Sequence, residues 1–364
     1  MSFNEKDDDY KIEVPKEERT LDTVSYDYSV SYIHNLIESK KIILEVPFQR
    51  KFIWTEDRSS QLIESLILNV PIPPIYFAEE DDGKWLVIDG LQRLNTIKTF
   101  FQNEFALKKL DVIQELNKAK YKDLPPKAKS LLEDGLLRVN VIKKTSHPDI
   151  KFDIFMRLNK GAVTLNYQEL RNCMYRGIFN DLLKEIVLEN IDFNKIMKQS
   201  KPNSRYLDVE FILRGFAISD NLICENGNYI IKNYKGKMVK YLNDYMDDMR
   251  KNFTIELIET YKIRFIETYK KIVNVFGYDN SFRDISSDNN KIYKAIMDLI
   301  FTSFEKISEE SSIENKELIY ELLLNLLNSN QKFRDSITYR TSDKDVLNNR
   351  IDIWMKELEE NELL

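Results

Sequence analysis

The residues with the clearest potential for chemistry form a six-residue motif, Ile-Asp-Gly-Leu-Gln-Arg, at positions 88–93. An apolar run precedes the motif, and helical spacing begins directly after it. The first turn of a helix is electrically positive and leaves backbone N–H groups unpaired, so it suits a phosphate that Gly90 would let approach closely. Asp89 could hold a divalent cation, Gln92 could position a water, and Arg93 could grip phosphate oxygens. These three residues are the predicted catalytic set, with Asp89 as the metal ligand.

The same motif has a purely structural interpretation. Asp89 could do no more than cap the helix, Gly90 could only make the turn, and Arg93 could pair with an acid. The spacing of the residues does not decide between the two interpretations.

Two further segments carry polar side chains that could complete a phosphate site. Gln49 and Arg50 stand among aromatic residues in the run Val-Pro-Phe-Gln-Arg-Lys-Phe-Ile-Trp at 46–54. Arg50 could meet a phosphate and Gln49 a base or sugar edge, or the aromatics could be core and Arg50 a surface ion pair. The second segment supplies Asn159, Lys160 and Arg171 at a helix end, a turn and a helix start. These residues could bind a nucleotide or tie two helices together.

The elements that must position these residues alternate between strands and helices in the first part of the chain. We expect a helix over 30–40, a strand over 42–46, a helix capped by Thr55, a hairpin of strands at 75–77 and 85–88, a helix from Leu91 and a strand over 139–142. The hairpin delivers the Asp-Gly pair to the start of the helix. This half of the chain therefore predicts a small α+β domain.

From about Asp149 the pattern is helical almost to the end. Helices are expected over 150–158, after a capping box formed by Asn166 and Glu169, and near 206–219, 237–249, 254–275, 291–306 and 315–328. The predicted fold class is α+β, with a mixed-sheet domain followed by a mostly helical one. The expected organisation is a flexible arm at 1–20, a nucleotide-handling domain at 21–175 and a helical domain at 176–364.

Composition narrows the classes of function. The net charge is -6 with a pI near 5.4, which excludes a uniformly cationic nucleic-acid binder, so any such binding must use a local patch. Cys173 and Cys224 are too few for a disulfide framework. We expect Cys173 to be a buried thiol. The acidic N-terminal region and the lack of a long apolar run predict a cytoplasmic protein without a membrane partner.

Taken in order, the three segments resemble the N-terminal domain family of the GmrSD modification-dependent restriction systems. The family pattern has a proline, an aromatic residue and Gln-Arg before a Trp, then Pro-Ile-Pro-Pro-Ile, Asp-Gly-Gln-Gln-Arg, Arg-Leu-Asn and Glu-Ile-Arg. This chain matches it at 47–50 and Trp54, 71–75, 89–93, 157–159 and 169–171. The resemblance covers about residues 27–250 and weakens after 180.

The resemblance implies a ParB/sulfiredoxin-like fold, with nucleotide binding or hydrolysis at the Asp-Gly-x-Gln-Arg motif. It carries Asp89, Gly90, Gln92 and Arg93 over as motif residues, and Gln49 and Arg50 as a companion motif. It also implies a role in defence against foreign DNA. The chain departs from the pattern at Leu91, where the family has Gln. Leu cannot hydrogen-bond a water, so hydrolysis is lost if that Gln is catalytic and unaffected if it only packs.

Several chemistries are excluded by residue content. Proteins of this type often add an HNH nuclease, which needs histidines, but the chain has only His34 and His147. No Gly-rich loop with Lys-Ser or Lys-Thr is present, so a P-loop NTPase is excluded. The basic residues Lys195, Lys198, Lys201 and Arg205 are interpreted as a solvated loop rather than a nucleic-acid site.

Two hypotheses remain for the function. The first is an NTP-binding sensor or regulatory subunit of a prokaryotic defence system, with nucleoside triphosphate and Mg²⁺ as cofactors. It could act as a Mg-dependent nucleoside triphosphatase, with DNA and a separate nuclease subunit as further partners. The second is a non-catalytic DNA- or protein-binding module that uses the same groove. A chain that nicks DNA itself is disfavoured by the scarcity of histidines.

Overall fold

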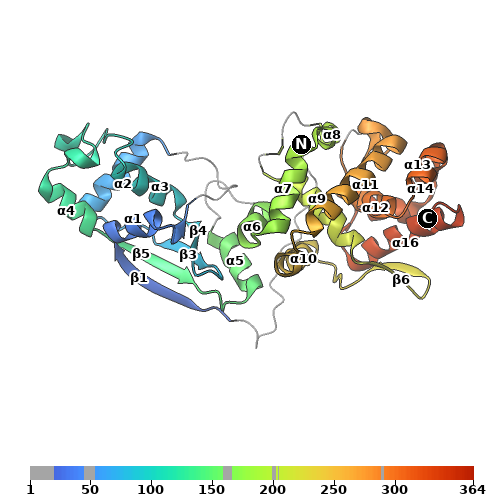
Figure 1. The fold of residues 1–364 in the computed structure, drawn as a ribbon, viewed down its shortest axis with the longest axis horizontal. Helices are drawn as coiled ribbons and strands as arrows, with labels where there is room; N and C mark the ends of the chain where they lie inside the picture. The colour runs from blue at the N-terminus through green and yellow to red at the C-terminus, as the bar shows by residue number, and fades with distance from the viewer. Residues whose placement is uncertain (1–19, 45–53, 159–165, 199–201, 204, 288–290) are drawn as a thin grey trace. The chain divides into compact units, whose positions relative to one another are not determined.

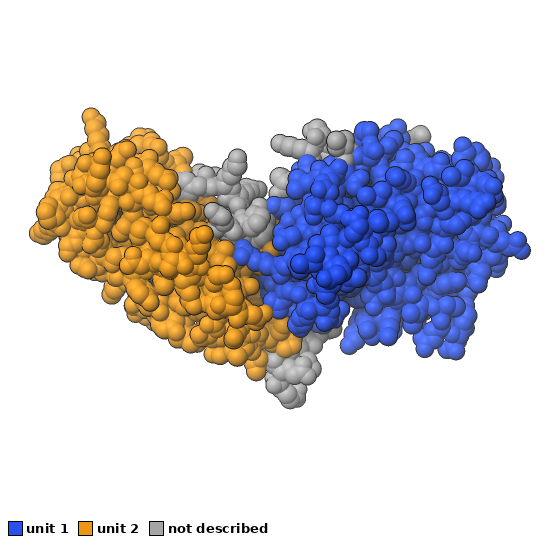
Figure 2. Space-filling view, viewed as in Figure 1, with its two compact units in different colours: residues 1–11, 174–364 blue, residues 12–173 orange. Residues whose placement is uncertain are grey.

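The structure is a computed structural model that describes residues 20–364 apart from 45–53, 159–165, 199–201, 204 and 288–290. The described residues fall into two compact units, 20–173 and 174–364 (Figure 2). Each unit has its own apolar core, so each is described by itself. No helix among the described residues has the length and apolar character needed to cross a membrane.

A five-stranded mixed sheet forms the centre of the first unit (Figure 1). Its strand order is β1-β5-β3-β4-β2. The pairs β1–β5 and β3–β4 are antiparallel, and β3–β5 and β2–β4 are parallel. The strands are β1 (Thr23–Ser29), β2 (Ile42–Ile43), β3 (Ile75–Glu79), β4 (Trp85–Asp89) and β5 (Leu136–Ile142).

Helices pack on one face of this sheet and close the core (Figure 1). Ser29 caps α1 by accepting from the Tyr32 N–H at 3.2 Å, and Thr55 caps α2 by accepting from the Arg58 N–H at 3.4 Å. The helices of this unit are α1 (Val30–Glu38), α2 (Glu56–Ile67), α3 (Leu91–Phe101), α4 (Pro126–Asp134), α5 (Pro148–Leu158) and α6 (Tyr167–Met174), with 3-10 turns η2 (Gln114–Leu116) and η3 (Tyr121–Asp123).

A buried carboxylate holds the long connection between α3 and α4. Glu64 on α2 accepts the backbone N–H groups of Asp111, Val112 and Ile113 at 3.2, 2.8 and 3.0 Å. Burial works against the charge, but the three donors outweigh it and hold the pKa of Glu64 below its usual value. The connection is therefore fixed onto α2 at its middle.

The second unit is helical around a large apolar core, with one small hairpin. Inside it, Asp298 accepts from the Arg214 guanidinium at 2.9 and 2.5 Å, and both side chains are buried. Its elements are α7 (Ile178–Glu189), α8 (Ile191–Ile196), α9 (Leu207–Ser219), β6 (Leu222–Glu225), β7 (Asn228–Ile231), α10 (Met238–Asn252), α11 (Leu257–Asn280), α12 (Lys294–Phe304), α13 (Glu309–Glu314), α14 (Lys316–Ser329), α15 (Gln331–Thr338) and α16 (Lys344–Glu360).

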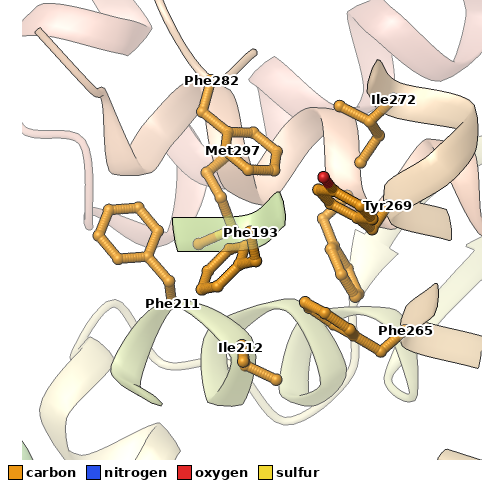
Figure 3. Close-up of a pocket in the computed structure, with 9 residues that line it drawn as sticks. Phe193, Phe211, Ile212, Phe265, Tyr269, Ile272, Phe282 and Met297 are labelled. Atoms are coloured by element: carbon orange, nitrogen blue, oxygen red, sulfur yellow. The ribbon is translucent and has the colours of Figure 1, made fainter. Parts of the chain in front are cut away.

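Figure 3 shows a small cavity in this core between α8, α9, α11 and α12. Its lining is aromatic and aliphatic, and the Tyr269 hydroxyl is the one oxygen among the side chains drawn. A water needs two to four polar partners, so a cavity with a single hydroxyl does not suit one. The cavity is a packing feature of the helical core.

The α+β class and the order of sheet before helices are confirmed. The Asn166–Glu169 capping box is also present: the Glu169 N–H donates to Asn166 Oδ1 at 2.8 Å, and the Asn166 N–H donates to Glu169 Oε2 at 2.6 Å. Cys173 is buried, as expected.

Three strands were missed: the two strands of the β6–β7 hairpin and the edge strand β1. The helical pattern predicted after Asp149 is interrupted by the β6–β7 hairpin, whose turn is Asn226-Gly227. The edge strand β1 precedes the first predicted helix. The predicted arm at 1–20 lies outside the described residues except for residue 20.

Candidate functional site

The central motif lies at the junction between β4 and α3. Asp89 is the last residue of β4, and α3 begins at Leu91. The β3–β4 register shifts between Tyr76 and Phe77, so a bulge lies next to the end of the strand that carries Asp89. Gly90 between them has φ 100°, a left-handed conformation that favours glycine. A Cβ at Gly90 would lie 3.1 Å from Ile75, so the turn is closely packed as well as left-handed.

Arg93 is bound to two backbone carbonyls that precede β3 and to the motif's acid. Its guanidinium donates to the Pro73 carbonyl, to the Pro74 carbonyl at 3.2 Å and to Asp89 Oδ2 at 2.9 Å. The residue is only 8% exposed. Burial lowers the pKa of the Arg93 guanidinium, and Asp89 partly opposes that shift. Arg93 therefore fastens the proline segment before β3 to the Asp-Gly turn.

Asp89 remains accessible despite this ion pair. Its side chain is 45% exposed, whereas that of Arg93 is 10% exposed. Among the described residues, Arg93 is the one partner of the Asp89 carboxylate. The carboxylate is thus oriented from the protein side and open to solvent beside the first turn of α3. An oriented, half-exposed acid at a helix start can serve as a ligand for a cation that also carries phosphate oxygens.

Gln92 connects the central motif to Trp54, which lies just before α2. Its Oε1 accepts the Trp54 backbone N–H at 3.3 Å. One turn later, Thr96 donates to the Gln92 carbonyl at 2.9 Å and to Ser59 Oγ on α2 at 3.3 Å. Leu91 is half-buried and packs against the apolar core of the first unit. The family's first Gln is therefore replaced here by a packing residue.

Arg171 lies on α6, a helix whose buried positions are mostly polar. Arg171 is 1% exposed and donates to Gln168 Oε1 at 2.8 Å, while Gln168 donates to Asn172 Oδ1 at 3.1 Å. Tyr167 at the start of α6 stacks on Phe152 of α5 with ring centroids 6.1 Å apart. The interpretation that this segment ties helices together is consistent with these contacts, and nucleotide binding by Arg171 stays a prediction.

The remaining predicted site residues, Gln49, Arg50, Asn159 and Lys160, lie outside the described residues, and their proposed contacts stay predictions. In the basic stretch, Lys195 lies on α8 rather than in a loop, and the interpretation of the stretch as solvated stays a prediction. Lys195 pairs with Asp192 at 2.6 Å, and Lys198 pairs with Asp279 at 3.2 Å. Lys201 also falls outside the described residues.

Within the described ranges, no three His, Cys, Asp or Glu side chains gather as a metal-binding group. A preformed all-protein metal cage is therefore absent from those ranges. Magnesium is commonly held by one or two carboxylates, with water and substrate phosphates as its other ligands. The Asp89 carboxylate fits that arrangement as a single protein ligand.

Sequence reasoning missed the two acceptors of Arg93 and the role of Gln92. The four-residue spacing of Asp89 and Arg93 was a usable signal, because such pairs adjoin at a helix start. No sequence signal pointed to the Pro73 and Pro74 carbonyls or to the Trp54 N–H, because a sequence does not show which backbone groups lack partners.

The fold and site define an α+β protein in which a mixed sheet presents an Asp-Gly turn and a half-exposed acid at a helix start. Residues 33–176 match the family described as GmrSD restriction endonuclease, N-terminal domain. This stretch is therefore similar to a GmrSD N-terminal domain, and it contains β2 to β5 and the whole motif. No curated protein and no solved structure matches the chain.

Proposed function

We propose that the first unit binds a nucleoside triphosphate with Mg²⁺ at the start of α3, as a sensor or regulatory part of a restriction-like defence system. The observation that carries this proposal is the Asp89 carboxylate, which is held by Arg93 at 2.9 Å yet 45% exposed. The defence role is supported by the match of residues 33–176 to a restriction endonuclease domain.

The charge at this site favours a metal-bound phosphate over a bare one. The first turn of α3 is the positive end of the helix dipole, and the first N–H groups of a helix have no partner within the helix itself, so this end attracts an anion. The neighbouring Asp89 repels an anion that arrives without a cation. A magnesium ion removes this conflict, because it binds the carboxylate and the phosphate oxygens together. In that complex the protein supplies Asp89 as metal ligand and backbone N–H groups as phosphate donors.

Arg93 and Gln92 act in this proposal by holding the site in place. Arg93 fixes the Asp89 carboxylate, and Gln92 fixes Trp54 beside α3. Arg50 lies four residues before Trp54 in the sequence. We propose Arg50 and Gln49 as the groups that meet the far end of the nucleotide.

The test is equilibrium binding of each of the four common NTPs to the full chain, with and without Mg²⁺, by calorimetry. Asp89→Asn is expected to weaken Mg²⁺-dependent binding at least tenfold, because it removes the anionic metal ligand. Asp82→Asn is the matched control: it makes the same charge change on the exposed β3–β4 turn, where Asp82 pairs with Lys84. Equal losses in both variants, or no binding of any NTP at millimolar concentration, would overturn the proposal.

Binding without hydrolysis is the second candidate, and one observation favours it. Leu91 packs where the family has Gln, and Gln92 Oε1 is engaged with the Trp54 N–H. Leu91 cannot hydrogen-bond a water, and the Gln92 oxygen already accepts a hydrogen bond. A non-catalytic module would bind its ligand, a nucleotide or the phosphates of DNA, and release no inorganic phosphate. Steady-state phosphate release from NTP with Mg²⁺, measured with and without DNA, separates the two candidates. Sustained release abolished by Asp89→Asn would exclude the non-catalytic module.

A further inference from the structure

The outer strand of the sheet in the first unit has an open edge. Among the described residues, β1 pairs with β5 and with no other strand, and it stands first in the strand order (Figure 1). An edge strand presents a row of backbone N–H and C=O groups that can pair with a strand of another chain. The residues of β1 therefore decide whether this edge is protected or available.

The register between β1 and β5 shows which backbone groups face outward. In an antiparallel pair, residues that exchange hydrogen bonds with the partner strand alternate with residues whose backbone groups point away from it. At one end of the β1–β5 register, the Lys143 N–H donates to the Asp22 carbonyl at 2.8 Å. At the other end, the Val30 N–H donates to the Gly135 carbonyl at 2.9 Å. The even-numbered residues of this segment therefore face β5.

The odd-numbered residues of β1 accordingly direct their backbone groups to the open edge. These residues are Thr23, Ser25 and Asp27, and all three side chains are exposed. Within the described ranges, no hydrogen bond involves the backbone N–H or C=O of Ser25 or Asp27. The edge thus offers a regular set of donors and acceptors.

The usual protection of an edge strand is missing from β1. Edge strands commonly carry a proline, a lysine or a bulge that prevents pairing with another chain. The strand Thr23–Ser29 has no proline and no lysine, and its register with β5 has no shift. Its one charged residue, Asp27, pairs with Arg138 of β5 at 2.7 Å. The edge is therefore regular and locally close to neutral.

The sequence of this edge has a two-fold symmetry. Residues 24–30 read Val-Ser-Tyr-Asp-Tyr-Ser-Val, which is the same in both directions around Asp27. Two copies placed antiparallel about an axis at Asp27 bring Ser25 opposite Ser29 and Tyr26 opposite Tyr28. Because the Asp27 backbone faces outward, the central pair exchanges two hydrogen bonds. The tyrosine pairs then occupy the positions without hydrogen bonds, where side chains approach most closely.

The tyrosines of β1 are already held in place. The rings of Tyr26 and Tyr28 stack with centroids 5.1 Å apart, and they stack on Trp85 of β4 at 6.2 and 6.3 Å. Both side chains are half-buried. Side chains that are ordered before association lose little freedom on binding. This arrangement favours pairing through β1.

We propose that β1 pairs antiparallel with β1 of a second copy of this chain, centred on Asp27, so that the two sheets become one. The contact uses the same surface on both copies, as a two-fold dimer requires. The charges across the junction are Arg138, Asp27, the partner's Asp27 and the partner's Arg138, and they sum to zero. β5 and β3 lie between β1 and the strand that ends at Asp89, so the inference does not depend on nucleotide binding.

The first experiment measures the mass of the full chain by sedimentation equilibrium from about 1 to about 200 µM. The chain of 43.3 kDa is expected to form a dimer. Ser25→Pro should raise the dimer dissociation constant at least tenfold, because it removes an outward N–H without removing a bond to β5. Ser25→Ala is the matched control. It loses the same hydroxyl bond to Asn140, at 2.7 Å, but keeps the N–H and should still form the dimer.

The second experiment tests the register by oxidative crosslinking, in a Cys224→Ser background that removes the exposed cysteine. Asp27→Cys places two thiols across the axis, with Cα atoms about 5.5 Å apart, and should give a covalent dimer. Ser25→Cys is the control, because its two copies lie about 14 Å apart in this register and should not crosslink.

Three outcomes would overturn the inference. The first is a mass of 43.3 kDa at every concentration, which would leave the edge to a strand of a different protein. The second is equal dimerisation of Ser25→Pro and Ser25→Ala. The third is equal crosslinking of the Asp27→Cys and Ser25→Cys chains. Circular dichroism checks that Ser25→Pro is folded, and the crosslinking result stands without that variant.

Discussion

Replacing Arg93 by Ala is the sharpest test of how the motif is built. The substitution removes three hydrogen bonds at once: those to the Pro73 carbonyl, to the Pro74 carbonyl and to Asp89. A hydrogen bond to a charged group contributes about 1.5–3 kcal/mol, and the carbonyls of the exposed Pro73 and the half-buried Pro74 lose theirs. The half-exposed Asp89 adds less than about 1 kcal/mol because solvent screens it. We expect the first unit to lose about 3–4 kcal/mol of unfolding free energy.

The assay is urea unfolding followed by tryptophan fluorescence, because Trp54 and Trp85 report on the first unit and Trp354 on the second. Hydrogen exchange of the peptide covering residues 71–79 gives the local readout, and it should rise in the variant. Arg93→Lys should recover only part of the loss, since one ammonium cannot reach all three acceptors. A change below about 1 kcal/mol in Arg93→Ala, with unaltered exchange, would refute the idea that Arg93 fastens the proline segment to the turn.

Three further substitutions test the packing around the site and in the second unit. Glu64→Gln should cost about 2 kcal/mol, because it weakens the bonds to three N–H groups. The folded pKa of Glu64 is depressed, so its contribution is complete above the unfolded pKa and is lost as pH falls through the folded pKa. As the pH falls, the urea midpoint of the wild-type protein should therefore approach that of Glu64→Gln. A difference between the two midpoints that stays constant with pH would contradict this. Gly90→Ala should cost about 1–2 kcal/mol from its left-handed φ and from contact with Ile75, seen in thermal melts of the first unit. Gly215→Ala places a Cβ 2.6 Å from the Phe301 ring and should lower the unfolding free energy of the second unit by about 1–3 kcal/mol, whereas an unchanged Trp354 transition would show that the ring moves freely.

Elements with strong local signals were predictable from the sequence. Thr55 with two acids after it marked the start of α2, and Asp-Asp-Gly between apolar runs marked the β3–β4 hairpin. The strand β1 gave a weaker signal because its Tyr residues alternate with polar ones at the edge of the sheet. Its place is decided by pairing with β5, more than 100 residues away in the chain. Long-range pairing of this kind leaves little trace in local spacing.

In the candidate site, too, the features with a local sequence signal were predictable and those decided by distant contacts were not. Asp89, Gly90, Gln92 and Arg93 were predicted as a group because they are contiguous in sequence. That Arg93 points into the protein was decided by two proline carbonyls that precede β3.

The inward orientation of Arg93 has a consequence for anyone who reads function from such motifs. An arginine that fastens a turn contributes to stability whether or not the protein keeps its chemistry. A sequence that retains the Asp-Gly-x-Gln-Arg motif therefore indicates an intact fold at this turn, and it does not by itself indicate catalytic activity. A motif search would therefore not separate active proteins from inactive paralogues. The residue at position 91 and the solvent-exposed side of Asp89 would be more informative about activity.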